Sequence, residues 1–135
     1  MKIYANKAKE NWVCDRMRNE FYKHCPHLAC DDINQADVFW AMAPWRLGNC
    51  SSWKNKNLLI SLYHIVPEKF NKKKLDHYNE NASAFHVICE KTKEAIAPYV
   101  SKPIFVAPFW LNYDIFFPLN KAQCRQELNL PPSAL

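Results

Sequence analysis

The sequence predicts an α/β fold, a three-layer sandwich built around a mainly parallel sheet. Short apolar runs alternate with segments whose apolar residues recur at helical spacing, and prolines follow several of the apolar runs. The 135 residues are about enough for one domain, and the 49% of hydrophobic residues supply one core. We therefore expect a single layered domain with right-handed crossovers between its strands.

The first expected elements are a strand, a helix and a second strand. Residues 2–5 are apolar and β-prone, and residues 10–24 carry apolar side chains three or four positions apart with charges between them. After a polar loop, the apolar run 37–43 predicts a buried strand, which Pro44 ends.

The middle of the chain predicts a further strand and helix. Residues 57–65 are almost continuously apolar, which is typical of a strand covered on both faces in a parallel sheet. Pro67 ends this run, and helical spacing resumes at 71–81.

The remaining elements repeat the same alternation. A short strand is expected at 84–89, followed at once by a helix at 90–99 with an acidic first turn. Another strand at 104–107 is closed by Pro108, and a last helix is expected at 120–128.

Glycine is almost absent, which limits the kinds of binding site that the chain can form. Gly48 is the only glycine beside nine prolines. Phosphate-binding loops need several glycines, because these let backbone N–H groups approach the anion closely. Neither the dinucleotide-binding motif nor the P-loop motif therefore occurs in this sequence, because each needs at least two glycines.

The charge and hydropathy patterns indicate a cytoplasmic protein. No secretory signal and no membrane-spanning run is found. The formal charge of +5 permits attraction to anions, and much of it lies between Lys69 and Lys74. We interpret these lysines as a solvated loop or helix start. Peripheral contact with the inner face of a membrane is the less favoured alternative.

The six cysteines are expected to be free thiols that pack as small hydrophobic residues. Cysteine and histidine gather between His24 and Cys30, but their spacing does not match the common zinc motifs and no second ligand pair follows. We therefore predict no metal site.

Two segments carry a family resemblance. The stretch Ser61–Phe70, SLYHIVPEKF, resembles one in the N-terminal half of retaining bacterial glycosyltransferases of family 4. From Phe85 to Leu130, several short motifs follow in the order of that family, including CEKT, KPI, PFWLN and FFPL.

The resemblance implies one half of a GT-B architecture, in which two Rossmann-like domains face each other across a cleft. Residues 1–118 would form the acceptor-side domain, and residues 119–135 a helix and the start of a linker to a donor-binding domain that this sequence does not contain. The complete enzyme would take a nucleotide-sugar donor and a sugar or lipid-linked acceptor, while this chain would bind no cofactor and be inactive alone. Two features depart from the family: the loop 7–12 has no glycine, and no pair of glutamates separated by seven residues occurs.

The candidate site residues lie in loops at the carboxyl ends of the expected strands, where open parallel sheets bind ligands. His64 is the catalytic candidate, because an imidazole can hydrogen-bond a sugar hydroxyl and titrates near neutral pH. The acceptor-binding candidates are Glu68, Lys69, Glu90, Thr92, Trp110 and Asn112. The candidates for the vicinity of the donor phosphates are Asn11, Asp15 and Arg16.

Each candidate also has a structural interpretation. His64 could be a structural histidine, and Glu68 and Lys69 an exposed ion pair. Glu90 and Thr92 could cap a helix, Trp110 and Asn112 could pack in the core, and Asn11, Asp15 and Arg16 could form a surface turn. The alternative function is a non-enzymatic α/β binding or interaction domain that kept the scaffold. Nucleic-acid binding is disfavoured, because the lysines are dispersed and the aromatic residues do not interleave with arginine.

Overall fold

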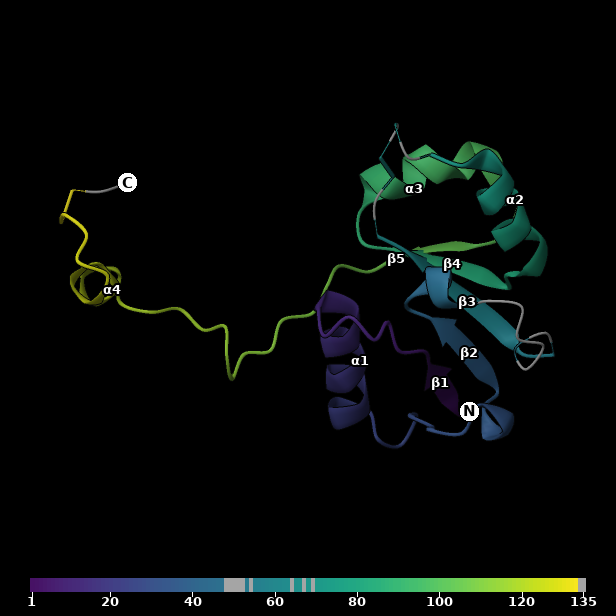
Figure 1. Cartoon of the computed structure of the whole chain (residues 1–135), viewed down its shortest axis with the longest axis horizontal. Helices are drawn as coiled ribbons and strands as arrows, with labels where there is room; N and C mark the ends of the chain where they lie inside the picture. Colours follow the sequence, from purple (N-terminus) through teal and green to yellow (C-terminus); the bar gives the residue numbers. More distant parts are fainter. Residues whose placement is uncertain (48–52, 54, 64, 67, 69, 134–135) are drawn as a thin grey trace.

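The computed structural model describes residues 1–47, 53, 55–63, 65–66, 68 and 70–133 and shows an α/β domain with a Rossmann-like sheet (Figure 1). Within this part of the chain, the strands form one all-parallel sheet whose spatial order follows the sequence. The strands are β1 (Ile3–Ala5), β2 (Val38–Ala41), β3 (Asn57–Leu62), β4 (Ala84–Val87) and β5 (Ile104–Val106). The predicted fold class is confirmed.

The helices lie where the helical spacing predicts them. They are α1 (Val13–His24), α2 (Lys72–Asn81), α3 (Glu90–Ile96) and α4 (Lys121–Glu127), with 3₁₀ turns η1 (Ile33–Gln35), η2 (Pro44–Arg46) and η5 (Ala97–Tyr99). Several predicted boundaries are wrong: β2 ends at Ala41 and not at residue 43, β4 ends at Val87 and not at residue 89, and two further ends differ by three residues. The first helix begins at Val13 and not at residue 10, because the preceding loop folds around a side chain of that helix, and β3 ends at Leu62 and not at residue 65.

The two faces of the sheet carry separate apolar clusters. Along β2, Phe39 and Ala41 point to the face that α2 and α3 cover, whereas Trp40 points to the face of α1. This alternation follows from the two-residue period of a strand. The sheet is therefore the middle of three layers.

The outer edge of β1 pairs with one further segment. Ile3 N donates to Leu28 O at 2.8 Å and Cys30 N donates to Ile3 O at 2.9 Å, which forms a parallel bridge between Ile3 and Ala29. The chain thus leaves β1, forms α1, touches the outer edge of β1 and only then returns to β2.

This detour explains why α1 lies on the opposite face from α2 and α3. The connections through α2 and α3 lead from β3 to β4 and from β4 to β5, that is, away from β1. The connection through α1 leads from β1 to Ala29, in the opposite direction along the sheet. With opposite steps and opposite faces, all three connections have the same hand, as the handedness rule for parallel sheets requires. The connections that leave β1 and β2 run in opposite directions along the sheet, so the topological switch point lies at the carboxyl ends of these two strands.

A hydrogen-bond chain that is buried at its centre crosses the sheet on the α1 face. Trp40 Nε1 donates to Ser61 Oγ, Ser61 Oγ lies 2.9 Å from His86 Nδ1, and His86 Nε2 lies 2.9 Å from Ala107 O. A carbonyl oxygen only accepts, so Nε2 of His86 carries the proton and Nδ1 accepts from the Ser61 hydroxyl. The chain joins β2, β3 and β4 to the residue that follows β5.

The chain after β5 leaves the sheet, and α4 lies apart from the domain at the far end of an extended segment (Figure 1). No residue of α4 is buried. Large hydrophobic side chains are exposed along this part of the chain, at Leu111, Tyr113, Ile115, Phe116, Phe117, Leu119, Leu128 and Leu130. The division at residues 118 and 119 stays a prediction.

Candidate functional site

A groove runs between α1 and residues 109–116, which follow β5 and return along that helix. Asn112 Nδ2 donates to Glu20 Oε1 at 2.8 Å, and Lys23 Nζ lies 3.1 Å from Asp114 Oδ2. Three neighbouring hollows of about 410, 150 and 440 Å³ lie along this contact, and Glu20 lines all three. We call these hollows together the α1 groove.

The floor of the hollow of about 410 Å³ is aromatic. The ring centroid of Trp110 lies 5.9 Å from that of Trp40, which packs edge-on against Phe21 at 5.5 Å. Trp110 remains 37% exposed, so part of its ring stays accessible from solvent. An aromatic face of this kind can stack on the C–H bonds of a sugar ring.

Glu20 is the carboxylate at the centre of the α1 groove. Its side chain is only 15% exposed, and it accepts from Asn112 while its Oε2 lies 3.2 Å from His24 Nε2. Carboxylate, amide and imidazole beside an apolar floor form the usual composition of a site that binds a polar organic ligand. The arrangement can hydrogen-bond hydroxyl groups through acceptors and donors alike.

The loop before α1 folds around the carboxylate of Asp15. The backbone N–H groups of four successive residues donate to it at 2.8–3.2 Å, namely Ala8, Lys9, Glu10 and Asn11. Burial raises the pKa of Asp15, but the four donors together outweigh this effect and lower the pKa below its usual value.

This loop has the form of an anion-binding turn that is already occupied. Lys9 and Asn11 have φ of 60° and 52°, in the left-handed region that favours glycine, and this turns successive N–H groups toward one point. Since Asp15 takes all four donors, they are not free for a phosphate in this conformation.

Five of the predicted site residues lie along the α1 groove. Asn11, Asp15 and Arg16 line the hollow of about 440 Å³, and Trp110 and Asn112 line the hollow of about 410 Å³. The guanidinium of Arg16 also lies 5.7 Å from the ring centroid of Phe116. The roles assigned to these residues stay predictions.

The other candidates lie elsewhere or are not described. Thr92 is buried at the start of α3, where its Oγ1 lies 3.3 Å from Cys89 Sγ, and Glu90 pairs with Lys93 at 3.2 Å. Glu68 is exposed. His64 and Lys69 lie outside the described residues, so the catalytic candidate has no structural account.

Sequence reasoning missed Glu20, although a signal was present. Arg16, Glu20 and His24 follow one another at intervals of four, so they share one face of α1. Three ionisable side chains on one helix face, beside the apolar face, are compatible with a binding surface. The partner Asn112 is 92 residues away in the sequence, which no local pattern reveals.

The five described cysteines are free thiols, and Cys50 lies outside the described residues. The expectation of burial holds for Cys14 but is wrong for Cys89, which is exposed before α3. In the described part of the chain, no group of three or more His, Cys, Asp or Glu side chains could hold a metal ion. No helix among the described residues is both long and apolar enough to cross a membrane.

No protein-family model, no curated protein and no solved structure is significantly similar to this chain. Its class is therefore defined by its own fold, a small α/β domain with a five-stranded, all-parallel, Rossmann-like sheet across the described residues.

Proposed function

We propose that the chain is the acceptor-side half of a nucleotide-sugar-dependent glycosyltransferase of GT-B architecture, and that it is inactive without a donor-binding domain. The family resemblance of Ser61–Phe70 and of residues 85–130 supports this proposal. The observation that carries it is the α1 groove, in which Glu20, Trp110 and Asn112 offer a carboxylate, an aromatic face and an amide together. These groups suit a hydroxyl-rich acceptor such as a glycan or a lipid-linked sugar.

The chemistry of sugar transfer explains the need for a second domain. Transfer builds positive charge at the anomeric carbon and negative charge on the departing diphosphate, and both must be stabilised away from water. The loop amides that precede α1 are taken by Asp15, so this chain offers no free backbone cradle there for the diphosphate. The donor would therefore be held by the other half of the enzyme.

The exposed apolar segment after β5 also supports the proposal that a separate domain binds the donor. Phe116, Phe117 and Leu119 present large hydrophobic side chains to solvent. Exposed apolar patches usually mark surfaces that another domain or protein covers. We infer that the donor-binding domain packs against this segment.

The experiment is a pair of NMR titrations of the 135-residue chain. Maltose serves as the acceptor probe and UDP-glucose as the donor probe. We expect maltose to shift the resonances of Glu20, Trp110 and Asn112, and Trp110→Ala to abolish this effect while the control Phe117→Ala leaves it intact. Micromolar binding of UDP-glucose would contradict the assignment to the acceptor side.

The coding sequence beyond residue 135 provides a second test. We expect it to encode another strand–helix domain containing two glutamates separated by seven residues. A stop codon at that point would favour the alternative, a non-enzymatic interaction domain. The occupied turn at Asp15 and the exposed apolar segment are also compatible with that alternative.

A further inference from the structure

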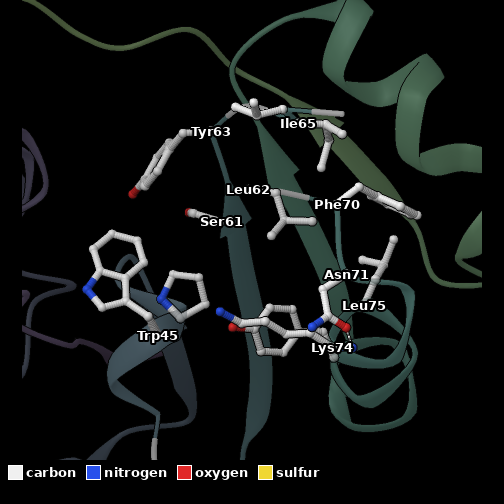
Figure 2. A pocket seen from close by; sticks show the side chains of 12 residues that line it. Trp45, Ser61, Leu62, Tyr63, Ile65, Phe70, Asn71, Lys74 and Leu75 are labelled. Atoms are coloured by element: carbon white, nitrogen blue, oxygen red, sulfur yellow. Dashed lines mark hydrogen bonds between the residues drawn. The ribbon is translucent and has the colours of Figure 1, made fainter. Parts of the chain in front are cut away.

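A second pocket lies on the opposite face of the sheet from the α1 groove, between η2, the carboxyl end of β3 and the start of α2 (Figure 2). Its volume is about 250 Å³. Figure 2 shows Leu62 at the centre, with Trp45 on one side and Phe70 and Leu75 on the other. We call it the β3 pocket. Within the described part of the chain, no residue lines both it and the α1 groove.

The walls of the β3 pocket are mainly apolar, and most of its buried polar groups are already paired. The Ser61 hydroxyl lies on the α1 face, where it bonds to Trp40 and His86, and Tyr63 Oη donates to Met42 O at 2.8 Å. Neither group needs a ligand to satisfy it.

Tyr78 is the exception. It lines the pocket and is only 6% exposed, yet among the described residues no atom accepts from or donates to its hydroxyl group. Burial raises the pKa of Tyr78 to about 12, so the group is a neutral O–H donor at physiological pH. Buried hydroxyl groups are normally hydrogen-bonded, and one that is not requires an explanation.

A cationic group accompanies Tyr78 on the same helix face. Lys74 lies one turn earlier in α2, lines the pocket, and places its Nζ 5.7 Å from the centroid of the Tyr78 ring. Asn71 Oδ1 accepts from Lys74 N at 3.0 Å and so fixes the start of the helix at the pocket. The β3 pocket therefore combines an apolar interior, one ammonium group and, beneath its wall, one unpaired hydroxyl group that is covered by neighbouring atoms, so that a ligand reaches it only when the side chains over it move.

We propose that the β3 pocket binds a small amphipathic anion, whose hydrocarbon body lies against Leu62, Phe70 and Leu75 while its carboxylate or phosphate oxygens accept from Tyr78 and Lys74. An apolar cavity of about 150 Å³ is enough for benzene, so this pocket can take a body of about eight to ten carbon atoms. Such a ligand supplies the acceptor that the Tyr78 hydroxyl lacks. The inference does not depend on sugar transfer, because binding is measured without any donor or acceptor sugar.

The test uses four probes that share or lack each part of the ligand. Octanoate and octyl phosphate carry the hydrocarbon body with a carboxylate or a phosphate, 1-octanol carries the body alone, and inorganic phosphate carries the anion alone. Each is titrated into the ¹⁵N-labelled chain and followed by NMR. We expect one or both octyl anions to shift residues 61–63, 65–66 and 70–78, with octanol binding more weakly and inorganic phosphate not at all. The tighter of the two anions identifies the head group.

Two variants separate a ligand contact from a structural role. Tyr78→Phe should weaken binding of the preferred octyl anion about threefold to tenfold, as expected for one lost hydrogen bond. The same change should leave the thermal midpoint of the free chain equal or higher, because it removes an unpaired buried hydroxyl. Tyr113→Phe, a change at an exposed tyrosine, is the matched control and should alter neither quantity.

Lys74→Gln should weaken binding of both octyl anions but not of 1-octanol, whereas Lys73→Gln should not affect either. Absence of shifts at the pocket with both anions at millimolar concentration would overturn the proposal. So would shifts confined to the α1 groove, or a folded Tyr78→Phe variant that binds the octyl anions as tightly as the unmodified chain.

Discussion

The side chain of Asn6 forms two hydrogen bonds with the backbone of Ala43, one as the donor and one as the acceptor. Asn6 Nδ2 donates to Ala43 O at 2.8 Å, and Ala43 N donates to Asn6 Oδ1 at 2.9 Å. The two residues follow β1 and β2, so this buried pair of bonds joins the carboxyl ends of both strands at the topological switch point.

Asn6→Ala should lower the free energy of unfolding by about 2–4 kcal/mol, because it leaves a buried N–H and a buried carbonyl unpaired. Urea denaturation followed by circular dichroism measures the change. The exposed Asn19→Ala is the control and should stay within about 0.5 kcal/mol of the unmodified chain. A loss for Asn6→Ala no larger than that of the control would show that the two bonds do not stabilise the switch point.

Asp15 should make the stability of the domain depend on pH in the acid range. Its folded pKa is lowered, so its contribution is fully present above the ordinary value of 3.8 and is lost as the pH falls through the folded pKa. Asp15→Asn should reduce the free energy of unfolding at pH 7 by about 1–2 kcal/mol.

The difference between the unmodified chain and Asp15→Asn should then shrink as the pH is lowered below 4. Denaturation at a series of pH values checks this sign. Asp76→Asn, at an exposed ion pair with Lys72, is the control, and its effect should be under about 0.5 kcal/mol at pH 7. A difference at Asp15 that grew on acidification would contradict the assignment of its four donors.

His86 should exist as the tautomer with its proton on Nε2. Long-range ¹H–¹⁵N NMR of the imidazole distinguishes the two nitrogens, and a proton on Nδ1 in the neutral ring would contradict the direction of the hydrogen-bond chain. His86 is 5% exposed, so His86→Leu should cost about 1–3 kcal/mol by leaving the buried Ser61 hydroxyl without its acceptor. The exposed His27→Leu is the matched control and should have little effect.

Cys89 should react with alkylating reagents before Cys14. Hydrogen bonds from the side chain and backbone of Thr92 lower the pKa of Cys89, whereas burial raises that of Cys14. At pH 7, iodoacetamide followed by mass spectrometry should therefore find Cys89 modified first. Thr92→Val should slow this modification, and faster alkylation of Cys14 than of Cys89 would contradict the geometry at the start of α3.

The secondary structure could be predicted because the apolar runs are short, regular and bounded by proline. Residues 57–65 predicted a strand covered on both faces, and β3 has α2 on one side and the aromatic residues of the α1 face on the other. The start of α1 could not be predicted from periodicity. It depends on Asp15 drawing the preceding loop around its carboxylate, and this contact is visible only in three dimensions.

The candidate site was less predictable than the fold. Trp110 and Asn112 were singled out by their place after β5, but Glu20 looked like an ordinary charged residue on a helix surface. Tyr78 fits the inward face of α2 together with Leu75, and sequence cannot reveal that its hydroxyl finds no acceptor. The role of His64 stays a prediction, because that residue lies outside the described part of the chain.

Ala29 pairs with the outer edge of β1 through a single bridge, and the domain can be enlarged at this edge of the sheet. Additional strand–helix units inserted between Ala29 and η1 would widen the sheet outward while leaving the pairing from β1 to β5 as it is. Insertions there should be accepted, whereas the same units placed between β3 and β4 would split the central layer.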